Sequence, residues 1–341
     1  MFNKYVWKRF LIALKDRDYS ALSGMFEFVL FRLMGSLFAF PTILILWILK
    51  PIVWIKVGVL PAERIGHLVM NTDLFLRRRQ LGIYPDGHYY CFLCSPKGLA
   101  NRQLLTMFKR VLHVYESRIL TLMFNGLLPL LKRTPFYQDL PLNSNEYYEF
   151  NNAKPSLYFT PDEIEKGHRI LDQMGVDTKE VEYVCIFSRD DAYLKNKFPH
   201  NNWGYHNSRD ADIDGLIKAV KYLIEKGFTV IRIGSIVKKP INFSHEKLID
   251  YPFSKYKSDF MDIFLLAHCK FILASGASGL IGTAQCLDTP VLQVNSSECY
   301  KYTPITKNCL YLPKKYKYRD SNSYIHFKDA IKIAVSQRER A

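Results

Sequence analysis

Residues 270–294, KFILASGASGLIGTAQCLDTPVLQV, contain a strand, a loop, a helix and a second strand in succession. The apolar runs at 270–275 and 290–294 predict two buried strands, and residues 279–287 between them predict a helix. Small residues at 275–279 join the first strand to that helix. A strand, a helix and a strand in this order favour a parallel sheet with the helix on one face.

The same alternation extends through most of the chain. Patterns typical of strands lie at 52–60, 87–95, 181–188 and 228–234, and helical patterns lie at 67–80, 97–114, 161–174, 213–226, 260–268 and 327–337. We expect residues 119–131 to be apolar and buried, and residues 133–160 to be irregular. The fold class is predicted to be α/β, with two Rossmann-like, doubly wound domains behind an N-terminal apolar helical segment. The predicted boundaries are 1–50 for that segment, 51–175 and 176–312 for the two domains, and 313–341 for a basic tail.

The charge of the chain is concentrated at its two ends. The 341 residues include 47 Lys and Arg against 32 Asp and Glu, a formal net charge of +15. Residues 1–150 carry +9, residues 151–300 carry −1 and residues 301–341 carry +7. A basic surplus suits nucleic acid or an anionic membrane surface, but no segment resembles a base-reading module, so we expect the membrane and no nucleic acid. The 48% content of hydrophobic residues argues against a mostly disordered chain, and seven Cys are too few for a disulfide scaffold.

The N-terminal segment contains 17 uncharged residues, 33–49, LMGSLFAFPTILILWIL, between Arg32 and Lys50. A membrane-spanning helix needs roughly 20 apolar residues, so this stretch is at the lower limit. Three alternatives remain open: a single span, a buried core helix, and a helix or helical pair in the cytoplasmic leaflet. Pro41, Trp47 and the basic flanks favour the third. We expect a cytoplasmic protein held peripherally at the inner face of the cell membrane, with a single span as the alternative.

Polar and small residues follow the predicted strands, at the edge where a doubly wound sheet binds its ligand. The loop Ser275–Gly279 precedes a helix N-terminus, which suits a phosphate or diphosphate; a tight turn without a ligand is the alternative. Arg189 follows another strand, where its planar guanidinium can hold a diphosphate by paired hydrogen bonds. A surface pair with Asp190 or Asp191 is the alternative for this arginine.

Two further segments carry similar alternatives. Asn207 and Arg209 precede a helix and are candidate ligands of a sugar or phosphate, unless Asp212 simply caps that helix. Arg232 lies within an apolar strand, where its charge must be either used or paired, for example with Asp250. The full set of ligand-site candidates is Ser188, Arg189, Asp190, Tyr193, Asn207, Arg209, Arg232, Gly234, Ser235, Ser275, Gly276, Ser278 and Gly279.

In the first domain, His67 follows Gly66 at the start of a predicted helix. A helix N-terminus lowers the pKa of a histidine, which keeps the imidazole neutral and able to accept a proton. A purely structural histidine is the alternative. Asp73 is a second candidate base, which can instead cap the helix or pair with Arg77.

No motif for a metal or a resident cofactor is present. Cys91 and Cys94 form a single C-x-x-C on a predicted strand rich in aromatic residues, which favours core packing over zinc. The chain contains no P-loop lysine motif, H-E-x-x-H, G-x-S-x-G or full G-x-G-x-x-G. We therefore expect neither a metal nor a cofactor.

Residues 52–80, IVWIKVGVLPAERIGHLVMNTDLFLRRRQ, resemble the strand, glycine loop and helix that open heptosyltransferase-like enzymes of the GT-B fold. In those enzymes an acidic residue after the loop glycine is the usual base, and His67 holds that position here. The segments FSRDDAYL, HNSRDADI, TVIRIGS, LIDYP, SDFMDIFLLAHCKFILASGASGL and PVLQVN resemble, in this order, a family of bacterial glycosyltransferases associated with surface-polysaccharide synthesis. Together with RIGHLVMNTDLFL they span residues 57–300.

This resemblance implies a GT-B-like, metal-independent glycosyltransferase that moves a sugar from a nucleotide-sugar donor to an acceptor hydroxyl, with inversion at the anomeric carbon. The implied donor diphosphate lies on Ser275–Gly279 beside Arg189 and Arg209, and His67 or Asp73 deprotonates the acceptor. The implied acceptor is a glycan or lipid-linked glycan in the synthesis of lipopolysaccharide or capsule. Two alternatives are a nucleotide-sugar epimerase of the same fold and a non-catalytic, membrane-associated binding protein.

Overall fold

The chain forms two compact units in this computed structural model. The structure describes residue 14 and residues 19–140, 146–176, 182–197, 203–297, 305–321 and 323–338, so most of residues 1–18 of the predicted N-terminal segment lie outside the described residues. Unit 1 comprises the described residues of 1–62, 85–99 and 112–140, and unit 2 those of 63–84, 100–111 and 141–341. The two units alternate along the chain, and the predicted domain boundaries stay predictions.

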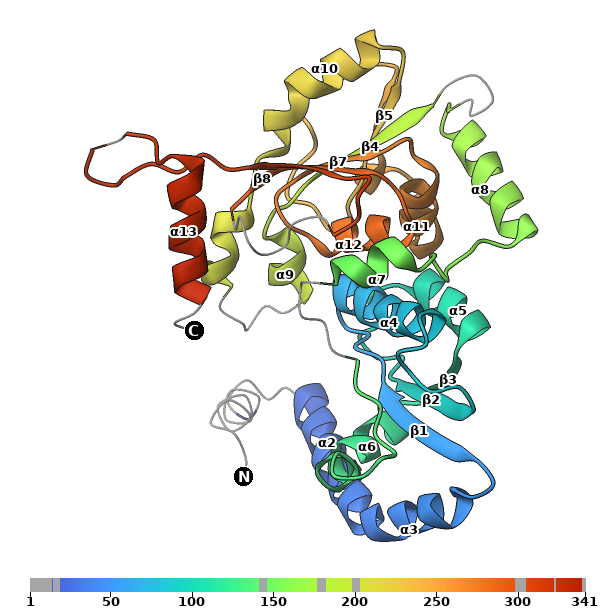
Figure 1. Cartoon of the computed structure of the whole chain (residues 1–341). Helices are drawn as coiled ribbons and strands as arrows, with labels where there is room; N and C mark the ends of the chain where they lie inside the picture. The colour runs from blue at the N-terminus through green and yellow to red at the C-terminus, as the bar shows by residue number, and fades with distance from the viewer. Residues whose placement is uncertain are drawn as a thin grey trace. The chain divides into compact units, whose positions relative to one another are not determined.

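Unit 1 contains, in its described residues, a parallel sheet in the order β1-β2-β3 (Figure 1). The elements of this unit are α2 (Tyr19–Leu37), α3 (Ala39–Leu49), β1 (Trp54–Val59), β2 (His88–Cys94), β3 (His113–Glu116) and α6 (Arg118–Leu131). Strands β1 and β2 confirm the predictions at 52–60 and 87–95. The unit has a small core that includes Leu46, Phe124 and Phe136.

Strand β3 was not expected, because the predicted helix over 97–114 covers its first residues. The helix found there, α5 (Arg102–Val111), begins later and ends earlier. The chain beyond it pairs with β2, with Cys91 opposite His113 and Cys94 opposite Glu116. A strand of four residues is too short to show a period, and its pairing overrides the local helical preference.

Helices α2 and α6 approach each other closely through two glycines. A Cβ atom on Gly35 would lie 1.8 Å from the carbonyl oxygen of Met123, and one on Gly126 would lie 1.9 Å from that of Arg32. Ser36 donates a hydrogen bond across the same contact to the carbonyl of Gly126, at 3.3 Å. The backbones of the two helices are therefore in contact, and any side chain at either glycine would separate them.

Helix α3 exposes most of its apolar surface. Phe40, Leu44, Ile45, Trp47 and Ile48 are between 47% and 74% exposed. This exposure is the opposite of what a buried core helix over 33–49 would show. In the part of the chain that the structure describes, no single helix is long and apolar enough to cross a membrane, and residues 22–37 and 39–49 meet that test only as a pair bent by 49°.

Helix α6 corrects the expectation for residues 119–131. The segment is apolar, as expected, but Ile119, Leu120 and Leu130 are exposed rather than buried. The described residues of the neighbouring stretch 133–160, which was expected to be irregular, include a short helix, α7 (Tyr147–Asn152).

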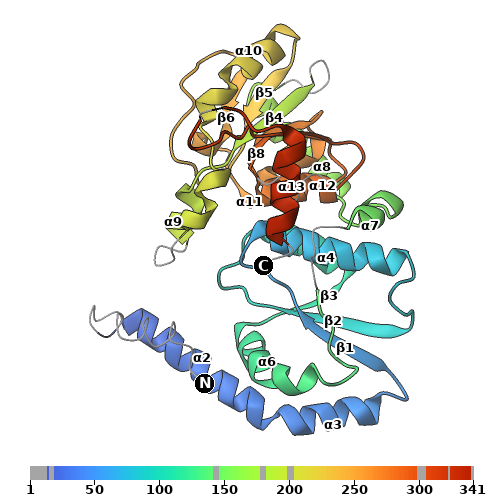
Figure 2. The ribbon, with the colours of Figure 1, turned by 60° about the vertical axis from the view of Figure 1, so that its left-hand side comes forward.

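The described residues of unit 2 form a six-stranded parallel sheet in the order β6-β5-β4-β7-β8-β9. Figure 2 labels four of these strands, β4, β5, β6 and β8. The strands are β4 (Tyr183–Ser188), β5 (Thr229–Arg232), β6 (Leu248–Asp250), β7 (Ile272–Ser275), β8 (Val291–Ser296) and β9 (Leu310–Pro313). The α/β class with parallel strands is thus confirmed. The outer strands β6 and β9 were not predicted, because three or four residues are too few to display a period. Strand β4 pairs with β5 on one side and β7 on the other, so the residues after these three strands meet at one edge.

Helices pack on both faces of this sheet. One face contacts α8 (Pro161–Gln173), α11 (Asp259–His268) and α12 (Gly279–Cys286), and the other contacts α10 (Ile217–Glu225). The other helical elements of this unit are α4 (Ile65–Gln80), α5, α7, α9 (Ala192–Lys197), α13 (Phe327–Arg338) and the 3-10 turns Gly204–Arg209, Ile213–Leu216 and Tyr251–Phe253. The predicted helix over 213–226 therefore begins as a 3-10 turn, and the helices predicted over 67–80, 161–174, 260–268, 279–287 and 327–337 are confirmed within a few residues.

The close contact between α2 and α6 can be tested by its effect on the stability of the protein. We expect Gly35→Ala to lower the free energy of unfolding by about 1–3 kcal/mol, because the added methyl group meets backbone that cannot move aside alone. Gly24→Ala is the matched control on the same helix, since the atoms nearest its Cβ lie 4.0 Å away. It should gain about 0.5–1 kcal/mol from helix propensity. Urea denaturation followed by circular dichroism measures both, and equal stability of the two variants would contradict the close contact.

Candidate functional site

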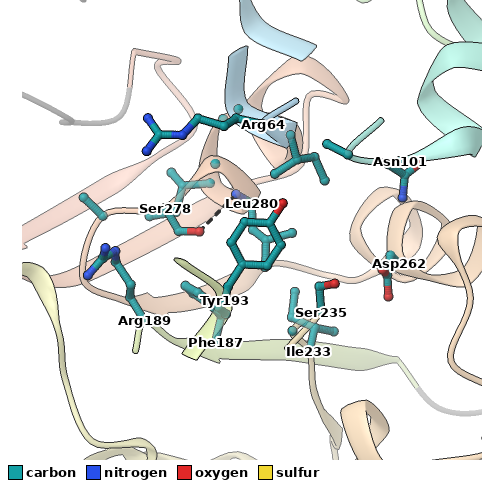
Figure 3. A pocket seen from close by; sticks show the side chains of 18 of the residues that line it. Arg64, Asn101, Phe187, Arg189, Tyr193, Ile233, Ser235, Asp262, Ser278 and Leu280 are labelled. Carbon is teal, nitrogen blue, oxygen red and sulfur yellow. Dashed lines mark hydrogen bonds between the residues drawn. The ribbon is translucent and has the colours of Figure 1, made fainter. Parts of the chain in front are cut away.

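A cavity of about 310 Å³ lies in unit 2, at the edge where β4, β5 and β7 end (Figure 3). Its volume is near the lower end of the ~300–1,000 Å³ usual for ligand pockets. The wall is formed by residues that follow these three strands, by the first turn of α4 and by the residues just before α5. The expectation that polar residues after neighbouring strands meet is confirmed here.

The structure brings most of the sequence candidates to this cavity and leaves five outside it. Those that line it are His67, Ser188, Arg189, Asp190, Tyr193, Arg209, Gly234, Ser235, Ser278 and Gly279. Those that do not line it are Asp73, Asn207, Arg232, Ser275 and Gly276.

Two glycines bring the N-termini of α4 and α12 together at the cavity. A Cβ atom on Gly66 would lie 2.9 Å from the Cα of Gly279, and one on Gly279 would lie 2.7 Å from the nitrogen of Gly66. Ser278 caps α12 and accepts a hydrogen bond from the N–H of Leu280 at 3.3 Å. The positive partial charges of two helix N-termini therefore fall on one cavity.

Gly276 shapes the site without lining it. Its φ is +86°, a conformation that favours glycine, and a Cβ atom there would lie 2.3 Å from the carbonyl oxygen of Arg209. The loop after β7 and the segment before α10 can meet only because this residue has no side chain. The absence of a side chain at Gly276 thus explains how Arg209 comes to the cavity.

Three arginines converge on the cavity: Arg64, Arg189 and Arg209. Arg189 is only 8% exposed, and burial together with the positive charges of Arg209 and Arg64 lowers its pKa, while Asp190 and Asp191 oppose that shift. The repulsion between Arg189 and the other two guanidinium groups makes this part of the cavity an electrostatic environment suited to a polyanion.

The sequence analysis gave an ion pair with Asp190 or Asp191 as the alternative role of Arg189, and the structure corrects the partner. The ion-pair partner of Arg189 is Asp210, which precedes α10, rather than Asp190 or Asp191. Asp190 instead connects the loop after β4 to the loop after β5. It accepts hydrogen bonds from the N–H groups of Ala192 at 3.0 Å and Lys238 at 2.9 Å. Local spacing could not show that a carboxylate about twenty residues away reaches the arginine.

His67 lies in the first turn of α4 with an exposed side chain on the cavity. Burial and the positive charge of Arg64 lower its pKa, and a hydrogen bond with Asn71 acts in the opposite direction. The imidazole is therefore neutral near pH 7, as a proton acceptor must be. The nearby Arg64 also packs against Trp203, 5.1 Å from the ring centroid.

Asp73 does not face the cavity, which corrects its candidacy as a base. It is fully buried and accepts a hydrogen bond from Nε of Arg77 at 2.6 Å. Arg77 in turn donates to the carbonyl of Ala153 at 2.6 Å. Burial raises the pKa of the Asp73 carboxyl, and the ion pair opposes that rise. A carboxylate enclosed by protein cannot reach an acceptor hydroxyl, so its role is the structural pair with Arg77.

Arg232 is likewise corrected from ligand candidate to structural residue. It is 1% exposed, contacts Asp250 at 3.1 Å and donates to the carbonyl of Lys239 at 2.7 Å. These partners satisfy its charge inside the protein, which is the alternative that the sequence left open.

Ser275 and Asn207 also lie outside the cavity. Ser275 is 1% exposed and accepts a hydrogen bond from Asn295 at 3.0 Å, because the last residue of β7 is still inside the sheet. Asn207 is exposed on the 3-10 turn before Asp210. In both predicted loops, only the C-terminal part lines the cavity: Arg209 in one, and Ser278 with Gly279 in the other.

Asp262 lines the cavity and was missed by the sequence candidates. It lies in the first turn of α11, where an acidic residue is explained by the helix dipole alone. Its Oδ1 accepts a hydrogen bond from the hydroxyl of Tyr251 at 2.7 Å, and burial raises its pKa to about 6. Asp262 lies in the segment SDFMDIFLLAHC, where nothing in the local sequence distinguishes it from Asp259.

Cys91 and Cys94 are buried on β2, so core packing is confirmed for the C-x-x-C pair. Among the described residues, no group of three or more His, Cys, Asp or Glu side chains could hold a metal ion.

No protein-family model and no curated protein matches the chain. Among solved structures, a glycosyl transferase family 9 protein from Veillonella parvula is 9% identical, with 84% of this chain and 90% of that chain covered and a TM-score of 0.47. E. coli heptosyltransferase WaaC with ADP is 10% identical, with 84% and 100% covered and a TM-score of 0.39.

A third structure, the dodecameric iron-containing heptosyltransferase TibC in complex with ADP-D-beta-D-heptose, is 13% identical. The alignment covers 79% of this chain and 65% of that chain, with a TM-score of 0.38. These structures are of the class that the sequence resemblance named. Likenesses of this size assign neither a family nor an activity to the chain.

Proposed function

We propose that the chain is a glycosyltransferase whose nucleotide-sugar donor binds in the cavity of unit 2. The observation that carries the proposal is the convergence of Arg64, Arg189 and Arg209 beside the N-terminus of α12. Their mutual repulsion is relieved by a ligand with more than one negative charge, and a diphosphate is such a ligand. The apolar residues of the wall, which include Phe187 and Ile233, suit the uncharged part of the same molecule.

In the proposed reaction, the acceptor hydroxyl oxygen attacks the anomeric carbon while the bond from that carbon to the diphosphate oxygen breaks. The hydroxyl proton passes to a ring nitrogen of His67, and the electron pair of the broken bond leaves with the nucleoside diphosphate. Attack from the side opposite the leaving group inverts the anomeric centre. Arg189 and Arg209 stabilise the charge that grows on the diphosphate, so this scheme needs no metal ion.

We further propose that unit 1 rests on an anionic membrane leaflet that carries a lipid-linked acceptor. The exposed apolar side chains of α3 would enter the leaflet, because a helix that is apolar on all sides is otherwise costly in water. Lys50 lies 4.8 Å from the ring centroid of Trp47 and 4.2 Å from that of Trp54. Aromatic rings beside a lysine at the end of an apolar helix are typical of a membrane–water interface.

The donor site is tested with Arg189→Ala. We expect the affinity for a nucleoside diphosphate to fall about tenfold to a hundredfold, because charge-assisted hydrogen bonds to the phosphates are lost. Arg169→Ala, which removes an exposed arginine of α8, should leave the affinity unchanged. A thermal-shift screen of UDP, GDP, ADP and CDP on the wild-type protein selects the ligand, and calorimetry measures each variant. If Arg189→Ala binds the nucleoside diphosphate as tightly as the wild type does, the diphosphate does not bind beside Arg189.

The base is tested with His67→Gln. We expect turnover to fall by a factor of about 10²–10⁴ while donor binding is retained, because only the proton acceptor is removed. Since burial and Arg64 lower the pKa of His67, wild-type turnover should stay level at neutral pH and decline only below about 6.5. His245→Gln, at an exposed position outside the cavity, serves as the control. Full activity of His67→Gln would eliminate this residue as the base.

The membrane surface is tested by co-sedimentation with vesicles. We expect binding to vesicles that contain phosphatidylglycerol, weaker binding to vesicles of phosphatidylcholine alone, and loss of binding in the double variant Ile45→Ser with Ile48→Ser. Leu310→Ser, at a side chain of β9 that is 70% exposed, is the control and should bind as the wild type does. Equal sedimentation with both kinds of vesicle would contradict a role for anionic lipid.

A further inference from the structure

The cavity continues along α4 and α12 beyond the contact of Gly66 with Gly279. In the next turns, a Cβ atom on Gly282 would lie 2.3 Å from Sδ of Met70, and both residues line the cavity. Gln285, one turn further along α12, lines it as well. Because an α-helix rises about 1.5 Å per residue, Gln285 lies about 9 Å along the helix axis from Gly279. A diphosphate at the helix N-terminus therefore does not account for this part of the wall.

Helix α7 and the segment that follows β8 close the same part of the cavity. Arg77 of α4 donates hydrogen bonds to the carbonyl of Phe150 at 3.2 Å and to that of Cys286 at 3.4 Å, so it joins α7 to the last turn of α12. Glu146 lies one turn before Phe150, and the carbonyl of Ile305 accepts a hydrogen bond from a side chain of α7 at 2.8 Å. The distal end of the cavity is thus the part of its wall formed by Met70, Glu146, Gly282, Gln285 and Ile305.

Gln285 is a buried polar side chain that packing alone does not explain. It is 2% exposed, and among the described residues no hydrogen bond to its side-chain amide is found. A buried amide without a partner costs free energy that a leucine of similar size would not. Because Gln285 lines the cavity, a ligand there can supply the missing hydrogen bonds.

Glu146 adds a carboxylate to the distal end. It is 1% exposed and lines the cavity, and its side chain does not cap α7. A carboxylate accepts hydrogen bonds, whereas an amide both donates and accepts them. Hydroxyl groups match this pair because they also do both, and an anion does not because Glu146 repels it. Met70 and Ile305 provide apolar surface for the C–H groups of the same ligand.

We propose that the distal end of the cavity binds a sugar ring, with Glu146 and Gln285 forming hydrogen bonds to its hydroxyl groups. The inference rests on the proposed function, because it places the ring in the cavity that holds the nucleotide-sugar. Two sources of the ring share this chemistry: the sugar that is transferred, and the sugar that carries the acceptor hydroxyl. Both come together beside His67, one turn before Met70 on α4.

The deciding variant is Gln285→Leu, which removes the amide and keeps a side chain of similar size. Without a ligand it should melt no lower than the wild type, because leucine avoids the cost of the buried amide. Glu146→Gln removes the charge of the other residue. Gln173→Leu and Glu165→Gln make the same two changes at exposed positions of α8 and are the matched controls.

The probes are the nucleoside diphosphate selected by thermal shift and the nucleotide-sugars in which it carries glucose, galactose, mannose or N-acetylglucosamine. The methyl glycosides of these four sugars are added separately, to protein saturated with the nucleoside diphosphate. We expect Gln285→Leu and Glu146→Gln to bind the nucleoside diphosphate alone as tightly as the wild type does, because it contains no part that reaches the distal end. Calorimetry measures the nucleotides, and thermal shift measures the glycosides.

The two kinds of probe distinguish the sources of the ring. If the distal end holds the transferred sugar, both variants lose about tenfold to a hundredfold in affinity for the nucleotide-sugar that the wild type binds most tightly. If it holds the acceptor sugar, both keep that affinity and lose the thermal shift that a glycoside produces in the wild type. Either result supports the inference.

Three results would overturn it. The first is wild-type behaviour of both variants with every nucleotide-sugar and every glycoside. The second is an equal loss of affinity for the nucleoside diphosphate alone, which would show an effect on the nucleotide site or on the fold. The third is a melting temperature of Gln285→Leu below that of the wild type, which would assign its amide to an internal partner.

Failure of this inference can be told from failure of the proposed function. If Arg189→Ala loses affinity for the nucleoside diphosphate and the variants of Gln285 and Glu146 behave as the wild type with every sugar probe, the donor site stands and the sugar site is overturned. If the wild type binds no nucleotide but the two variants lose a response to glycosides, the sugar site stands and the nucleotide-sugar donor is overturned. If the wild type binds no probe of either kind, both are overturned together.

Discussion

The site depends on the contact between the first turns of α4 and α12, where Gly66 meets Gly279 with no room for a side chain. A third glycine brings the helices together one turn further along α12, since a Cβ atom on Gly282 would lie 2.3 Å from Sδ of Met70. A larger residue at Gly66 or Gly279 would meet backbone and separate the two helices, whereas one at Gly282 would displace the Met70 side chain. The consequence is electrostatic as well as steric, because two helix N-termini with partial positive charge then face the same cavity.

Around that contact, charge is distributed unevenly. Three arginines bring positive charge to a place where helix termini already provide it, and Asp262 adds an acid in a different part of the wall. Buried charges elsewhere in unit 2 are paired within the protein, Arg77 with Asp73 and Arg232 with Asp250. Arg189 also has an internal partner, Asp210, but unlike Arg77 and Arg232 it lines the cavity, where a ligand can reach it.

Unit 1 follows a different principle. Its helices α2 and α6 make backbone contact through Gly35 and Gly126, a mode of packing that membrane helices use because small residues permit close approach. Its third helix, α3, leaves large apolar side chains exposed. Unit 1 therefore leaves a large apolar surface outside its small core. The proposed contact with a membrane leaflet would bury this surface.

The sequence alone determined the α/β class, the parallel order implied by alternating strands and helices, and the placing of polar residues after strands, because these depend on short periodic patterns and on chain connectivity. It also located Arg189, Arg209, His67 and the loop ending at Gly279. Only the tertiary structure decided which of these residues share a cavity, because that depends on contacts between distant segments. The ion pair of Arg189 with Asp210, the burial of Asp73 against Arg77 and the approach of Tyr251 to Asp262 are all of this kind, since side-chain partners chosen across a fold leave no local pattern.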